Sequence, residues 1–223
     1  MTIRAMILDF DGTLVTADIS DILAGLAGKQ AESEELNRLF HGGQLRGLEG
    51  LVRRINFLSG LPVAELKQAV AENDFLRPGA HELFAFLKAR GIISIIASGS
   101  IVPLLEVYQA KLGADYIIGS RPIIKDGRLV SISAAEYSGP DYKVRDSSII
   151  LKQLGIPASA VVAIGDSPAD RGLFEMAAAS IAIDPKAGIE RDADFTIRGD
   201  LSAAIPILER LMQSGPAAAL QTP

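Results

Sequence analysis

The sequence predicts an α/β protein in which helices cover both faces of a parallel sheet and a helical segment is inserted after the first strand. Two observations indicate this fold class. Short apolar runs rich in β-branched residues alternate with segments of helical periodicity along most of the 223 residues, which is typical of a parallel sheet between helices. After the first such run, helical periodicity fills an interval of about 75 residues before the second one.

The composition is that of a soluble globular protein, with 48% hydrophobic and 22% charged residues. The net charge of −5 argues against a broad nucleic-acid surface, and no apolar run is long enough to span a membrane. The lack of cysteine excludes thiol catalysis and thiolate metal sites, and we expect a cytoplasmic protein. His41 and His81 fall in helical patterns, where solvated or packed roles are expected.

The strands and helices of the core follow one another along the chain. The predicted strands are Ile3–Leu8, Ile92–Ala97, Tyr116–Ile118, Val161–Ile164, Ile181–Ile183 and, at an edge, Phe195–Ile197. The predicted helices are Pro78–Arg90, Ile101–Gly113, Val144–Leu154 and Ala169–Ala179. Glycines end the first three helices, and Pro168 suits the first turn of the fourth.

Residues 16–77 are predicted to form a separate helical cap. Its helices are expected over Asp18–Leu26, Glu32–Phe40, Leu48–Leu58 and Val63–Asn73. Residues 1–15 and 78–214 then make up the core, and residues 215–223 a loose tail. An Asp-Gly turn within 123–130 predicts a hairpin outside the main sheet.

Polar side chains follow several predicted strands at the point where each strand ends. They are Asp9 and Asp11, Ser98 and Gly99, and Asp166 and Asp170. Lys143 stands just before the helix that leads into Val161–Ile164. Ligands of open α/β sheets bind beyond the carboxyl ends of the strands, so we expect these residues to converge. Taken singly, each could also be a turn, a cap or a solvated residue.

Three carboxylates at one edge of a sheet repel one another, which raises their pKa values and lowers stability. A divalent cation relieves this repulsion. Because oxygen atoms are the available ligands, Mg²⁺ is the expected metal. A metal, a carboxylate nucleophile, a hydroxyl and a lysine together suit phosphoryl transfer, in which negative charge spreads over three oxygens.

These residues resemble, in order and position, the four motifs of the haloacid dehalogenase superfamily of phosphatases. The matching motifs are Asp9-Phe-Asp-Gly-Thr13, Ser98, Lys143 and Gly165-Asp166-x-x-x-Asp170. The resemblance implies a Rossmann-like core with a small cap of the first type. Within that superfamily, the phosphoserine phosphatases are similar at Asp9–Val15, Gly43–Pro62, Ser98-Gly99, Ile124–Leu129 and Lys143–Gly155.

The resemblance implies that Asp9 is the nucleophile and forms an aspartyl-phosphate. Asp11 would protonate the leaving alkoxide and then deprotonate the hydrolytic water. This assignment is chemically coherent, because a covalent intermediate divides one difficult step into two easier ones and one carboxyl can act as acid and then as base. The side chains of Asp9 and Asp166 and the backbone carbonyl of Asp11 would hold Mg²⁺.

The same resemblance implies a phosphate-binding set. Ser98, Gly99 and Lys143 would bind the substrate, with Ser98 and Lys143 holding the phosphoryl oxygens. Lys143 would also offset the charge of Asp9. Asp170 would orient Lys143 or a metal-bound water.

Two cap residues resemble the serine-binding pair of the phosphoserine phosphatases. Asp18 stands where an acid takes the substrate ammonium, and Arg54 where an arginine takes its carboxylate. Asp18 also suits a helix N-cap, and Arg53-Arg54 a solvated helix face. Asp18 stands in place of the usual Glu, Ser100 in place of Gly and Ala169 in place of Asn, so the substrate stays open.

The sequence thus predicts a Mg²⁺-dependent phosphomonoesterase for a small phosphorylated metabolite, with O-phospho-L-serine as the first candidate. A phosphatase for another metabolite and a phosphotransferase are the alternatives within enzymes. A switch that is phosphorylated on Asp, like a receiver domain, is disfavoured because it needs neither Asp11 nor a cap. We expect no nucleic-acid or membrane partner, and a monomer or homodimer.

Overall fold

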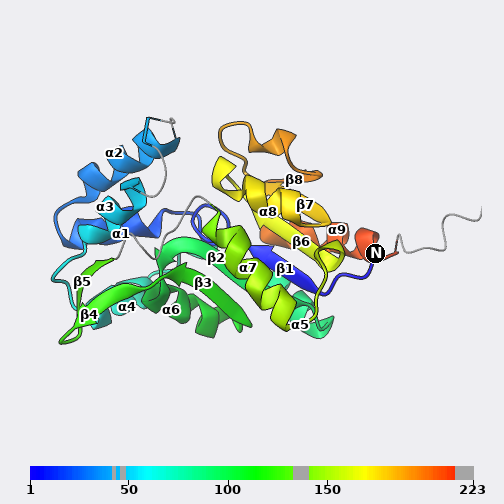
Figure 1. Cartoon of the computed structure of the whole chain (residues 1–223), viewed down its shortest axis with the longest axis horizontal. Helices are drawn as coiled ribbons and strands as arrows, with labels where there is room; N and C mark the ends of the chain where they lie inside the picture. The colour runs from blue at the N-terminus through cyan, green and yellow to red at the C-terminus, as the bar shows by residue number, and fades with distance from the viewer. Residues whose placement is uncertain (42–43, 46–48, 133–140, 214–223) are drawn as a thin grey trace, which may run out of the picture.

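The computed structural model of the chain describes residues 1–41, 44–45, 49–132 and 141–213. Within these residues, six parallel strands form one sheet in the order β3-β2-β1-β6-β7-β8, which confirms the predicted α/β class (Figure 1). The strands are β1 (Ala5–Leu8), β2 (Ile93–Ile101), β3 (Tyr116–Ser120), β6 (Val161–Gly165), β7 (Ala179–Ile183) and β8 (Phe195–Ile197). β1, β6 and β7 are buried along their whole length because they lie inside the sheet.

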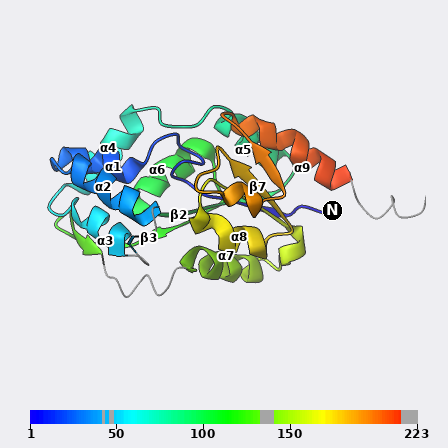
Figure 2. The same ribbon diagram turned by 90° about the horizontal axis from the view of Figure 1, so that it is seen from above.

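Helices cover both faces of this sheet, as Figure 2 shows. On one face lie α5 (Ala80–Ala89), α6 (Val102–Leu112) and α9 (Ala204–Gln213), and on the other α7 (Tyr142–Gln153) and α8 (Arg171–Met176). The order of the strands changes direction at β1, which pairs with both β2 and β6. The carboxyl ends of these three neighbours therefore meet at one edge, the usual place for a ligand in this class of fold.

Four helices lie between β1 and α5 in the chain, as predicted for an insertion. They are α1 (Ile19–Leu26), α2 (Gln30–His41), α3 (Glu49–Asn56) and α4 (Val63–Glu72). α1, α2 and α3 pack on one another beside the carboxyl ends of the strands, whereas α4 packs on α6 (Figure 1). The two linkers pair with each other, since Val15 bridges Leu76 and the Thr16 amide donates to the Phe75 carbonyl at 3.0 Å.

The predicted hairpin consists of β4 (Pro122–Lys125) and β5 (Arg128–Ile132), which form a sheet of their own. Its turn residues Asp126 and Gly127 have φ angles of 50° and 72°, as an Asp-Gly hairpin turn requires. The hairpin joins the inserted helices. The Gly60 amide donates to the Leu129 carbonyl at 2.7 Å, and the Val63 amide to the Gly127 carbonyl at 2.9 Å.

Two predicted elements are wrong in detail. The helix expected over Ala169–Ala179 is a short 3₁₀ turn, Pro168–Asp170, followed by α8, which ends at Met176 because Ala179 already pairs with Val162 in the sheet. Burial inside the sheet overrides the helix propensity of the alanines there. Lys143 lies in the first turn of α7 rather than before the helix. The sequence interpretation also omitted α9.

The remaining predictions about the chain concern histidines, the tail and membranes. His81 is exposed on α5. The side chain of His41 and the tail predicted over 215–223 lie outside the described residues. None of the helices in the described ranges is both long and apolar enough to cross a bilayer.

Candidate active site

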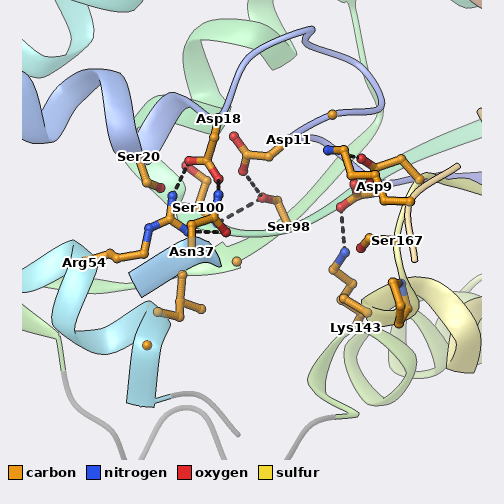
Figure 3. Close-up of a pocket in the computed structure, with 18 of the residues that line it drawn as sticks. Asp9, Asp11, Asp18, Ser20, Asn37, Arg54, Ser98, Ser100, Lys143 and Ser167 are labelled. Atoms are coloured by element: carbon orange, nitrogen blue, oxygen red, sulfur yellow. Dashed lines mark hydrogen bonds and ion pairs between the residues drawn. The ribbon is translucent and has the colours of Figure 1, made fainter. Parts of the chain in front are cut away.

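The loops that follow β1, β2 and β6 open into a cavity of about 400 Å³, which α1, α2 and α3 line from the other side (Figure 3). Eight predicted site residues line it: Asp9, Asp11, Asp18, Arg54, Ser98, Gly99, Lys143 and Asp166. Asp170 lies fully buried behind Lys143. A cavity of this volume suits a small metabolite.

Asp9 is held between a lysine and a threonine. Its Oδ1 lies 2.6 Å from Lys143 Nζ, and its Oδ2 accepts a hydrogen bond from Thr13 Oγ1 at 3.1 Å. Lys143 Nζ also donates to Oδ1 of Asp170 at 2.8 Å. The first turn of α7 directs Lys143 toward Asp9, as Figure 3 shows. The lysine therefore fixes the direction of the Asp9 carboxylate.

The pKa values of Asp9 and Lys143 are shifted because charged groups are buried together. Burial raises the pKa of Asp9 well above its usual value, the charge of Asp170 raises it further, and Lys143 opposes both. Burial alone would lower the pKa of Lys143, but Asp170 and Asp9 outweigh it and raise that pKa. One buried lysine thus pairs with two carboxylates, so its charge balances only one of them. A further positive charge would balance the other.

The acids at this edge fit a hard divalent cation. Carboxylate oxygens of Asp9, Asp166 and Asp170 lie within 4.8 Å of one another. Both oxygens of Asp170 have donors, Oδ1 in Lys143 at 2.8 Å and Oδ2 in the amides of Asp166 and Ser167 at 3.1 and 3.2 Å, and Asp170 does not line the cavity. Asp9 and Asp166 do line it and are the candidate ligands, and oxygen-only donors favour Mg²⁺.

Asp166 is also paired with a lysine that the sequence interpretation did not select. Lys186 Nζ lies 2.5 Å from Asp166 Oδ2, and the Lys186 amide donates to the Asp166 carbonyl at 2.7 Å. Burial raises the pKa of Asp166, and Lys186 opposes this rise. Gly12 packs closely here, because a Cβ on it would lie 2.1 Å from Asp166 Oδ2 and its φ is +83°.

Asp11 points to the other side of the cavity from Lys143. Its Oδ1 accepts from the Ile19 amide at 3.0 Å, and its Oδ2 lies 3.4 Å from Ser98 Oγ. Burial raises the pKa of Asp11 to about 7, and the charge of Asp18 adds to this rise. A carboxyl with such a pKa can donate and accept a proton near neutral pH.

The end of β2 presents Ser98 and Gly99 to the cavity, where the register with β3 is irregular. The Ser100 amide donates to Ser98 Oγ at 2.9 Å and orients the hydroxyl. A Cβ at Gly99 would lie 2.9 Å from the Leu51 side chain and 3.2 Å from Tyr142 Oη. Glycine at this position lets α3 approach the sheet edge closely.

A second cluster lies on the helical side of the cavity and surrounds Arg54. Its guanidinium pairs with Asp18 and lies 2.9 Å from Oδ1 of Asp21. Arg54 Nε donates to Ser33 Oγ at 3.1 Å, and Nη1 lies 3.4 Å from Asn37 Oδ1. Figure 3 shows Asp18 and Arg54 facing each other. Two acids and one arginine leave this cluster with one net negative charge.

Asp18 caps α1, as one of its two sequence interpretations predicts, by accepting from the Asp21 amide at 3.2 Å, and it also pairs with Arg54. The solvated face applies to Arg53, whose side chain is 55% exposed, and not to Arg54, at 9%. The charges of Asp18 and Asp21 raise the pKa of Arg54, against burial, which would lower it.

Several residues around the cavity were given no role by the sequence interpretation. They are Thr13, Ser20, Asp21, Ser33, Asn37, Tyr142, Ser167 and Lys186. Lys186 could have been found, because it follows the predicted strand Ile181–Ile183 and so belongs to a strand end. Asn37 and Ser33 carry no such signal, since their role depends on how α2 packs against α1 and α3.

The chain is similar to phosphatases over most of its length. A family model described as haloacid dehalogenase-like hydrolase matches residues 6–175. A phosphoserine phosphatase of Methanocaldococcus jannaschii is 30% identical over 196 residues, which are 87% of this chain and 92% of that protein. One of Archaeoglobus fulgidus is 33% identical over 194 residues, 87% of this chain but only 56% of that protein.

Solved structures show the same similarity. A substrate-bound phosphoserine phosphatase complex matches with a TM-score of 0.83 at 28% identity, covering 93% of this chain and 99% of that one. A phospho-aspartyl intermediate analogue of phosphoserine phosphatase matches with a TM-score of 0.82, at the same identity and coverage. The similarity extends over both the sheet and the inserted helices.

Proposed function

The chain belongs to the haloacid dehalogenase-like hydrolases, and from this premise we propose that it is a Mg²⁺-dependent phosphomonoesterase that phosphorylates Asp9 during turnover. The main support is the position of the Asp9 carboxylate at the edge of the cavity, where it binds Lys143 Nζ at 2.6 Å and Thr13 Oγ1 at 3.1 Å. Asp11 and Ser98 line the same cavity. A fixed nucleophile beside an acid of raised pKa suits a two-step transfer.

In the first step, Asp9 attacks phosphorus, the bond to the substrate oxygen breaks, and Asp11 gives its proton to the departing alkoxide. In the second, Asp11 takes a proton from water as the water oxygen attacks phosphorus, and the Asp9 carboxylate leaves. Ser98 and Lys143 hold the phosphoryl oxygens throughout. The Asp9 and Asp166 side chains and the Asp11 carbonyl would hold Mg²⁺, which would supply positive charge beside the transferring group.

We further propose O-phospho-L-serine as the substrate, with residues 16–77 as the cap that selects it. The cluster around Arg54 supports this choice. Its net negative charge suits an ammonium group, and the arginine guanidinium is the group that binds a carboxylate bidentately. The similar proteins named as phosphoserine phosphatases support the same substrate.

Steady-state assays with a panel of phosphorylated metabolites test this proposal. O-phospho-L-serine should give the highest kcat/KM, and sugar phosphates should be poor substrates. EDTA should abolish phosphate release, and Mg²⁺ should restore it. Equal activity on sugar phosphates would overturn the choice of substrate, and activity that survives complete metal removal would overturn the mechanism. Phosphate passed to added glycerol in preference to water would indicate a phosphotransferase.

Arg54→Ala should lower kcat/KM for O-phospho-L-serine, with a loss of about 2–5 kcal/mol in transition-state binding free energy, because a buried charge pair with the substrate carboxylate is lost. Phosphoethanolamine, which has the ammonium but no carboxylate, should be affected much less. Arg53→Ala is the matched control, since Arg53 is its exposed neighbour on α3. An equal loss on both substrates would show that Arg54 supports the cap without binding the carboxylate.

We extend the proposal to the organisation of the protein. Residues 1–15 and 78–214 form the catalytic core, and the enzyme works in the cytoplasm as a monomer or homodimer on a small metabolite. Cell fractionation measures the location, and light scattering measures the oligomeric state.

A further inference from the structure

The second linker carries a buried arginine that the proposed reaction does not use. Arg77 is 7% exposed and is not among the residues that line the cavity. Its Nε donates to the Thr13 carbonyl at 2.8 Å, and its Nη2 to the Gly12 carbonyl at 2.6 Å. Its Nη1 pairs with Asp184. Nη1 also lies 3.4 Å from the Gly199 carbonyl, so one guanidinium binds three backbone carbonyls and one carboxylate.

The Gly12 and Thr13 carbonyls belong to the loop that carries the nucleophile. Gly12 and Thr13 directly follow Asp11, and Thr13 Oγ1 donates to Asp9 Oδ2 at 3.1 Å. A displacement of Thr13 would move this hydroxyl and remove its hydrogen bond to Oδ2 of Asp9. Gly12 packs against Asp166, so its peptide has little freedom to shift without displacing that acid.

The carboxylate partner belongs to the loop after β7. Asp184 directly follows that strand and accepts from the Gly199 amide at 3.1 Å. Two residues later, Lys186 contacts Asp166 through both its amide, at 2.7 Å, and its Nζ, at 2.5 Å. Arg77 thus connects to Asp9 through Thr13 and to Asp166 through the loop of Asp184 and Lys186.

We propose that Arg77 is a positioning residue for phosphoryl transfer, which holds the loop after β1 and the loop after β7 together so that Asp9 and Asp166 meet in reactive geometry. The role rests on the proposed phosphatase function. Only a guanidinium supplies planar donors in the several directions that these four acceptors occupy, and an ammonium cannot reach them all. A shift of about 1 Å in a reacting group costs on the order of 10²-fold in rate.

Arg77→Lys tests the role because it keeps the charge for Asp184 but loses the planar fork. We expect kcat to fall about 100-fold on both O-phospho-L-serine and p-nitrophenyl phosphate, with each KM within about threefold of the wild-type value. Arg90→Lys is the control, since Arg90 forms an exposed pair with Glu209 at 3.3 Å, and its kcat should equal that of the wild type. Melting curves confirm that the assays are run on folded protein.

If Arg77 only stabilises the fold, Arg77→Lys should lower the melting temperature and leave the kcat of the folded protein within about threefold of the wild-type value. That result would overturn the proposal. If Arg77→Lys does not fold, Asp184→Asn decides, because it weakens the hold on the guanidinium while keeping the shape of the side chain. About a tenfold lower kcat at unchanged KM supports positioning, and an unchanged kcat overturns it. Wild-type protein that releases no phosphate from either compound would overturn the proposed function itself.

Discussion

Asp9→Asn should lower phosphate release by at least about 10⁴-fold, because an amide cannot attack phosphorus and loss of a nucleophile costs on this order or more. The variant should be at least as stable as the wild type in EDTA. Burial and the charge of Asp170 disfavour the ionised form of Asp9, and the amide removes this repulsion. Lys143 keeps Asp170 as a partner at 2.8 Å, so no buried charge is left alone.

Phosphate release and urea unfolding of purified Asp9→Asn measure the two effects. Asp194→Asn is the matched control, since that carboxylate accepts from the amide and hydroxyl of Ser180 at 2.9 and 3.0 Å and does not line the cavity. Activity above about 1% of the wild type in Asp9→Asn would rule out a nucleophilic role. A variant that is inactive and also unfolded would contradict the expected stability.

Lys143→Met should have the opposite effect on stability. It leaves Asp9 and Asp170 buried together without their shared lysine, and the removal of one partner from a buried ion pair costs about 3–5 kcal/mol. The rate should fall by on the order of 10³-fold, since the phosphoryl oxygens lose a charged donor and Asp9 loses its orientation. Urea unfolding in EDTA and steady-state kinetics in Mg²⁺ measure these changes.

A double variant separates charge from packing. Asp9→Asn combined with Lys143→Met should recover most of the lost stability, because the remaining acid, Asp170, keeps the amides of Asp166 and Ser167 as donors. Lys67→Met is the control, since its exposed pair with Glu106 at 2.7 Å should contribute less than about 1 kcal/mol. Wild-type stability in the single Lys143 variant would show that Lys143 does not compensate these acids.

The core of the fold was predictable because its signals are local. Each core strand is a short apolar run, and parallel pairing follows from the alternation with helices. The error at Ala179 shows the limit of such signals. An alanine-rich segment has helix propensity by itself, and only its pairing with Val162 makes it a strand.

The candidate site divides in the same way. Asp9, Ser98 and Asp166 were predicted because strand ends are visible in the sequence and the topology brings them to one edge. The partners of Arg54 were not, since Asp21 and Asn37 reach it only through the packing of α1, α2 and α3. Helical periodicity tells which face of a helix is buried, but not which helix covers it.

The sequence by itself determined the fold class, the order of the motifs and the oxygen-rich character of the site, since these depend on residue type and local periodicity. Only the tertiary structure decided that two acids share Lys143, that Asp18 and Asp21 share Arg54, and that Arg77 connects the loops after β1 and β7. These contacts join residues far apart in the chain, and they form because a buried charge without a partner is strongly destabilising.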